Sequence, residues 1–215
     1  MPDAAVFLRT EDADDRLWRL ARLSRADLLQ AVAAAVVAVG GCTANDPPTA
    51  RGYDAWRMAV RRLREVLMPQ GWERDDTGNF STVMNRLAGV RIAVVNTDGN
   101  TGNPHAYPTN RSRKGALADR ASEINQRILP FPEWDETEPE GASLPGIATW
   151  YLCVYVEGER VRAELSLPTK VQGGFFADWQ ERIILVGSNG DWSIADAPHL
   201  GDDDGPVFEV AVTRK

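Results

Sequence analysis

Histidine and cysteine are scarce in this 215-residue chain, which contains two of each. Cys42 and Cys153 are too few for a disulfide framework and lack CxxC spacing. Because His105 and His199 are the only histidines, the zinc motif HExxH cannot occur, and a zinc site would need four scattered ligands to converge. We therefore expect no metal site and no bound cofactor.

Standard catalytic and phosphate-binding motifs are missing as well. The chain contains neither GxxxxGK[ST] nor GxGxxG, and it lacks the nucleophile elbow GxSxG. The arrangement of a metal-dependent nuclease, an acid at a strand end followed by Glu-x-Lys, is incomplete because neither Glu-x-Lys nor Asp-x-Lys occurs. These absences favour a binding protein over an enzyme.

Long hydrophobic runs are also lacking. The alanine- and valine-rich stretch Leu28–Cys42 ends in a way that resembles a lipoprotein cleavage site, but it is shorter than the roughly 20 residues that span a bilayer. The residues before it are numerous and highly charged, whereas a signal peptide begins with a short basic region. We expect a soluble cytoplasmic protein without a membrane anchor.

Positive charge is in deficit overall, since the net charge is -7, but it is distributed unevenly. Residues 51–128 carry 13 basic and 8 acidic side chains, whereas residues 129–215 carry 6 basic and 16 acidic ones. Such asymmetry is typical of a basic face for an anionic partner. It equally suits two halves of one chain that attract each other on folding.

Helical spacing of apolar residues dominates the first third of the chain. It predicts one bent helix or two consecutive helices over residues 15–39, and a further helix over Gly52–Met68. The sequence Ser24-Arg25-Ala26-Asp27 has the form of a capping box, which favours a break near Ser24. These helices have the apolar stripes of elements that pack on a sheet.

The apolar period changes to two after residue 71. Residues 72–85 read as a β-hairpin, and the continuous apolar run Val90–Val95 predicts a strand that is buried on both faces. A polar loop follows, and then a helix that starts near Gly115. The middle of the chain is therefore a β-β-β-α unit.

Strands dominate the last third, after an acidic, proline-rich linker over Pro130–Gly146. We expect a single helical turn over Phe175–Gln180 and a hairpin turn at Asn189-Gly190. The strands expected there are Ile147–Val156, Arg160–Leu167, Arg182–Val186, Asp191–Ala195 and Val207–Thr213. The predicted fold is α+β, with N-terminal helices packed on a largely antiparallel sheet. We expect one domain over 1–215, subdivided into 1–129, the linker 130–146 and an antiparallel part 147–215.

A cluster of cations stands immediately before the central helix, at Arg111, Arg113 and Lys114. Unpaired amides at a helix N-terminus favour an anion, and cations there oppose the helix dipole. A locally unfavourable arrangement of this kind indicates a partner that supplies negative charge, which is either an external anion or the acidic linker Glu133–Glu140 of the same chain. Further cations that could extend the surface are Arg120, Arg127, Arg57, Arg61 and Arg64, and amides that could accompany them are Asn96, Asn100, Asn103 and Asn110.

Three functional hypotheses follow. The first is a non-enzymatic binding protein whose basic, amide-rich surface engages a polyanion, with nucleic acid as the first candidate. The second is a metal-dependent hydrolase that acts on a phosphodiester or nucleotide through Asp98 and His105. The third is an acidic protein-interaction module that uses Glu133–Glu140 and Asp202–Asp204 to bind a basic partner or imitate nucleic acid.

Overall fold

The computed structural model describes residues 4–128 and 146–187, which form helices and one sheet. The helices are α1 (Thr10–Ala21), α2 (Arg25–Gly40), α3 (Ala50–Leu67) and α4 (Ala116–Ile128), with short 3-10 turns at Met68–Gln70 and Thr77–Asn79. The strands are β1 (Ala5–Phe7), β2 (Glu73–Asp75), β3 (Thr82–Asn85), β4 (Val90–Asn96), β5 (Ala148–Glu157), β6 (Arg160–Gln172) and β7 (Phe175–Val186). The linker predicted over Pro130–Gly146 falls almost wholly outside the described residues, as do the turn at Asn189-Gly190 and the strands Asp191–Ala195 and Val207–Thr213.

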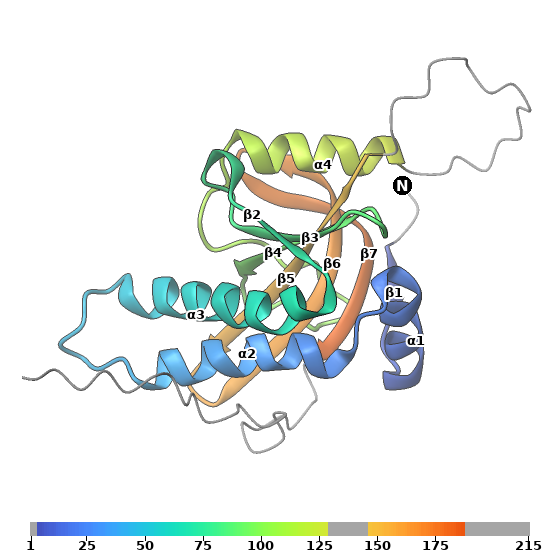
Figure 1. Ribbon diagram of the computed structural model, residues 1–215. Coiled ribbons are helices and arrows are strands. Elements are labelled where there is room, and N and C mark those ends of the chain that lie inside the picture. The colour runs from blue at the N-terminus through green and yellow to red at the C-terminus, as the bar shows by residue number, and fades with distance from the viewer. Residues whose placement is uncertain (1–3, 129–145, 188–215) are drawn as a thin grey trace, which may run out of the picture.

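The seven strands form a single sheet in the order β1-β7-β6-β5-β4-β3-β2 (Figure 1). Strands from both sides of the undescribed segment therefore join the same sheet. Four of the six neighbouring pairs are antiparallel, while β1 with β7 and β4 with β5 are parallel. The predicted α+β fold and the β-β-β-α unit are confirmed, and the parallel pairs make the sheet mixed.

The N-terminal helical region is divided where the sequence predicted. The Ser24 hydroxyl accepts a hydrogen bond from the Asp27 amide at 3.1 Å, and the Asp27 carboxylate accepts one from the Ser24 amide at 3.2 Å. This reciprocal capping starts α2 in a new direction, 99° from α1. No single helix in the described parts of the chain is long and apolar enough to cross a membrane.

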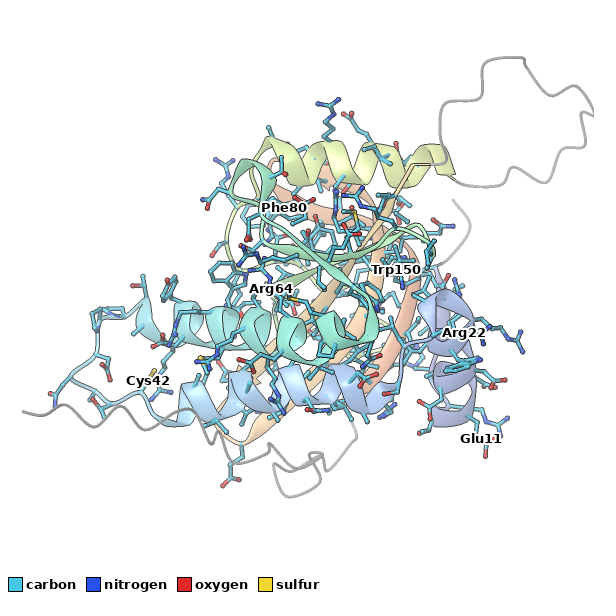
Figure 2. All side chains as sticks on the ribbon, viewed as in Figure 1. Glu11, Arg22, Cys42, Arg64, Phe80 and Trp150 are labelled. Carbon is cyan, nitrogen blue, oxygen red and sulfur yellow. The ribbon has the colours of Figure 1, made fainter. Side chains whose placement is uncertain are left out.

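Helices α1, α2 and α3 pack on one face of the sheet and form the main core with it. The side chains that meet there include Leu17, Leu28, Val32 and Leu63 from the helices and Ile92, Trp150, Leu152 and Leu165 from the strands. Trp150 lies among these side chains in Figure 2 and is only 2% exposed. The apolar stripes of the helices therefore pack against the apolar side chains at alternate positions of the strands.

The opposite face is covered by α4, which belongs to the connection between the parallel strands β4 and β5. Parallel neighbours need a long crossover, and this one crosses the second face. Asn125 fixes α4 to the sheet, because its amide nitrogen donates to the carbonyls of Thr149 and Pro168 at 2.9 Å. Its amide oxygen accepts from the Thr149 amide at 2.8 Å.

The expectation of a helical turn over Phe175–Gln180 is wrong, because these residues are the first half of the continuous strand β7. Register shifts around Pro168 let β6 and β7 stay paired although proline has no amide to donate. The buried rings of Phe176 and Trp179 pack with Tyr151 on the second face. Packing of these aromatic side chains outweighs the weak local pattern that indicated a turn.

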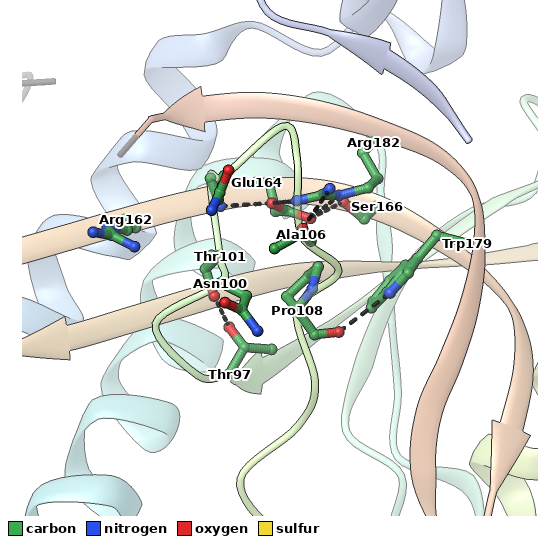
Figure 3. Close-up of polar contacts among 12 residues, drawn as sticks. Thr97, Asn100, Thr101, Ala106, Pro108, Arg162, Glu164, Ser166, Trp179 and Arg182 are labelled. Atoms are coloured by element: carbon green, nitrogen blue, oxygen red, sulfur yellow. Dashed lines mark hydrogen bonds and ion pairs between the residues drawn. The ribbon is translucent and has the colours of Figure 1, made fainter. Parts of the chain in front are cut away.

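Residues 97–110 lie against the second face and are fastened there by a buried ion pair between Glu164 of β6 and Arg182 of β7 (Figure 3). Both side chains are fully buried, and the closest nitrogen–oxygen distance is 2.7 Å. The Glu164 carboxylate also accepts from the Gly102 amide, while Arg182 donates to the Ala106 carbonyl at 2.9 Å. The Ser166 hydroxyl donates to Glu164 as well, so the pair joins two strands to the segment that covers them.

We predict that Arg182→Met lowers the free energy of unfolding by about 3–5 kcal/mol, because it leaves the Glu164 carboxylate buried without a counter-ion. Urea denaturation monitored by tryptophan fluorescence measures the loss. The double variant Glu164→Leu/Arg182→Met removes both charges and should be more stable than Arg182→Met alone. Losses that simply add in the double variant would contradict the coupling that we assign to this pair.

Candidate anion-binding groove

Strand β4 extends further than its neighbour β3, and this difference opens the sheet at one edge. The last pair between them joins Thr82 to Ala93, so no strand lies beside Val94 and Val95 on that side within the described residues. Beyond them the Arg111 amide donates to the Asn96 carbonyl at 3.0 Å, and Thr97 forms an antiparallel bridge with Asn110. Helix α3 approaches this edge from one face, and the start of α4 approaches it from the other. Phe80, just before β3, is seen close to α4 in Figure 2.

Two adjacent pockets follow this open edge, and we call them together the basic groove. The larger has a volume of about 350 Å³ and is lined by residues that include Trp56, Asn79, Phe80, Val94, Arg113 and Lys114. The smaller has a volume of about 210 Å³ and is lined by residues that include Arg51, Gly52, Asn96, Arg111, Val154 and Glu157. The N-terminal half of α3 forms one wall of each pocket. Residues 113–116 form another wall of the larger pocket, whereas Arg111 and the end of β5 with its following turn line the smaller one.

The cations before α4 are positioned by the turn between β6 and β7. Asn110 is 1% exposed and its amide donates to the carbonyls of Ser112 at 2.7 Å and Gly174 at 2.9 Å. The Lys114 amide also donates to Gly174, at 2.8 Å, and the Arg113 guanidinium donates to the Gly173 carbonyl at 3.1 Å. A hairpin turn thus holds the basic segment, whose residues Arg111, Arg113 and Lys114 line the groove.

Four cations line the groove: Arg51, Arg111, Arg113 and Lys114. None of them forms an ion pair with a carboxylate in the part of the chain that the structure describes. Arg111 instead lies over the Tyr155 ring at 5.2 Å. The one acidic side chain that lines the groove is Glu157, which accepts a hydrogen bond from the Tyr155 hydroxyl; that bond lowers the pKa of the carboxyl. The groove therefore has an excess of positive charge.

Lys114 differs from the other three cations because it is mostly buried. Loss of hydration lowers the pKa of its amine below the ordinary value for lysine, since burial penalises the charged form. The thiol of Cys153 below it is fully buried, and burial raises the pKa of that thiol. Cys153 is accordingly an inert neutral neighbour that does not compensate the ammonium.

The three arginines of α3 that the sequence predicted for this surface lie elsewhere and have partners. Arg57 pairs with Asp54 at 3.3 Å, Arg61 pairs with Glu65 at 2.6 Å, and Arg64 pairs with Asp76. Such pairs on a helix surface are the usual outcome for a charged face. On α4, Arg120 is exposed and does not line the groove, and the side chain of Arg127 is outside the described set. The structure thus brings together three of the eight predicted cations.

Only one of the four predicted amides lines the groove. Asn96 donates to the Gly52 carbonyl at 2.6 Å and so ties β4 to the first turn of α3. Asn110 is buried beneath the basic segment, as described above. Asn100 and Asn103 take part in local turns, in which the Asn103 side chain accepts from the His105 amide at 3.0 Å.

The arrangement around Asp98 is that of a turn. Its carboxylate accepts from the amides of Asn100 and Thr109, both at 3.2 Å. Among the described residues, no contact joins Asp98 to His105, and no group of three or more His, Cys, Asp or Glu side chains could hold a metal ion. The hydrolase hypothesis stays a prediction that these contacts do not strengthen.

Arg51, Gly52 and Trp56 are groove residues that the sequence did not indicate. Arg51 is about 60 residues from Arg111, and only the packing of α3 against β4 brings the two together. The sequence signal that was available is the absence of an acidic residue from the first turn of α3. Comparison with protein-family models, with curated proteins and with solved structures finds no match to this chain.

We predict that Lys114→Met raises the free energy of unfolding at pH 7, because it removes a poorly hydrated cation without a counter-ion. A lysine whose pKa is lowered on folding costs stability below its folded pKa, and that cost disappears as the pH approaches the ordinary value of 10.5. Urea denaturation of both proteins from pH 7 to pH 10.5 should therefore show a difference that shrinks with rising pH. A difference that is constant across this range would indicate that side-chain packing, and not charge, is responsible.

Proposed function

We propose that this chain is a non-enzymatic binding protein whose basic groove takes an anionic partner, with nucleic acid as the first candidate. The observation that supports this most directly is that four groove cations have no ion-pair partner among the described residues, whereas the three predicted arginines of α3 all have one. An exposed arginine remains hydrated at little cost. Lys114 is mostly buried, and a phosphate or carboxylate would compensate its charge.

The backbone adds to the attraction for an anion. Helices α3 and α4 both begin at the groove, so the amides of their first turns contribute partial positive charge there. The groove is short, and it offers four cations and not an extended basic face. For a nucleic acid that contacts all four, the logarithm of the affinity should fall with the logarithm of salt concentration with a slope of about -3.

The other hypotheses receive no support of this kind. Asp98 is engaged in a turn, and the acidic segments Glu133–Glu140 and Asp202–Asp204 lie outside the described residues. The location that we propose is the cytoplasm, which suits the free thiols of Cys42 and Cys153.

We predict that the triple variant Arg111→Glu/Arg113→Glu/Lys114→Glu loses salt-sensitive binding by at least about 100-fold, because three attractive charges become repulsive. Fluorescence anisotropy with a labelled 12-nucleotide DNA, titrated at several salt concentrations, measures the affinity. Because Arg113 donates to the Gly173 carbonyl and Lys114 is mostly buried, the triple variant should also melt at a lower temperature, so affinity is compared at a temperature at which both proteins are folded.

The matched control changes the same number of charges away from the groove. Arg19, Arg120 and Lys170 are exposed and do not line either pocket, so Arg19→Glu/Arg120→Glu/Lys170→Glu alters the net charge equally. If both triple variants weaken binding to the same extent, net charge and not the groove governs the interaction. If the unmodified protein binds no nucleic acid and no other polyanion at low salt, the proposal is wrong.

A further inference from the structure

An exposed aromatic ring lies next to a residue of the basic groove, and that residue is the one ring neighbour it has in the described parts of the chain. Tyr53, in the first turn of α3, is 59% exposed, and its ring lies 6.0 Å from that of Trp56 at an angle of 45°. Trp56 packs against the core on one side and lines the larger pocket on the other. The two rings extend the apolar surface of that pocket toward solvent.

Aromatic and cationic groups therefore meet at one place. Trp56 belongs to the α3 wall of the larger pocket, with the Tyr53 ring next to it, and Lys114 and Arg113 also line that pocket. The volume of about 350 Å³ lies at the low end of the range for small-molecule pockets, about 300–1,000 Å³. A ligand that uses both walls needs a flat apolar part and an anionic part close to each other.

We infer that the groove takes single-stranded nucleic acid, with one base stacked on Tyr53 beside Trp56 and the adjoining phosphate facing Lys114 and Arg113. This inference rests on the proposed function and specifies its partner. Single-strand binding sites combine a positively charged groove with aromatic side chains on which bases stack. In a duplex the base faces are covered by their neighbours, so a duplex could use the cations of the groove but not Tyr53.

The stacking also explains why an acidic peptide is the weaker candidate. Such a peptide would satisfy the four cations, but it has no obligatory flat ring to cover Tyr53. The Tyr53 ring, which is 59% exposed in the free protein, would then make no contact with the bound peptide.

The experiment compares three anionic probes by fluorescence anisotropy: a labelled 12-nucleotide oligo-dT, a duplex of the same length, which carries twice as many phosphates, and a poly-glutamate peptide with the charge of the single strand. We expect the single strand to bind at least tenfold more tightly than either of the others at equal salt. Tyr53→Ala should weaken binding of the single strand by roughly 5- to 150-fold, the range for loss of one stacked base. Its salt slope should stay the same, because no phosphate contact is lost.

Tyr53→Phe is the matched control, since it keeps the ring and removes only the hydroxyl, and it should bind like the unmodified protein. Equal affinity for single strand and duplex, or no effect of Tyr53→Ala, would overturn the inference while leaving the proposed function intact. Preference for the peptide would overturn it in the same way. Loss of binding to all three probes in the unmodified protein would instead overturn the proposed function itself. Equal melting temperatures of the Tyr53 variants exclude misfolding as the cause.

Discussion

The buried pair of Glu164 and Arg182 is the interaction on which the shape of the second face depends. Two charges placed in the interior require almost complete compensation, and here the compensation comes from each other, from Ser166 and from the backbone of residues 97–110. A segment that is rich in polar residues can cross the sheet only because these groups satisfy one another. The position of the basic segment that follows is set by this crossing.

The groove results from a mismatch between two strands and not from a motif. Strand β3 begins at Thr82, which pairs with Ala93, whereas β4 continues beyond Ala93 to Asn96. Side chains of α3 and of the residues before α4 fill the space only partly, and they surround it with cations. Conventional phosphate-binding loops gain their specificity from glycine-rich backbone, whereas this groove relies on side chains from two layers. Sequence searches for known motifs are insensitive to an arrangement of this kind.

Local patterns in the sequence predict much of the fold. The capping box at Ser24, the hairpin before β4 and the buried strand β4 are each encoded by residues that are close together in the sequence, and all three are present. The short parallel strand β1 and the full length of β7 depend on tertiary pairing, so local patterns miss them. For the same reason, the sequence places Arg113 and Lys114 at a helix start but does not reveal that Arg51 joins the groove. It also does not reveal that three arginines of α3 have acidic partners, which are Asp54, Glu65 and Asp76.

The open end of β4 has a mechanical consequence. In the described sheet no strand pairs with Val94 and Val95 on the β3 side, so no strand pairing connects α3 with the start of α4 there. Asn96 connects both sides of this place, because its side chain donates to the Gly52 carbonyl and its own carbonyl accepts from the Arg111 amide. A molecule bound between α3 and the start of α4 would contact both helices and so connect the two layers. Occupancy would then stiffen this corner, and the melting temperature would rise with ligand concentration by mass action alone.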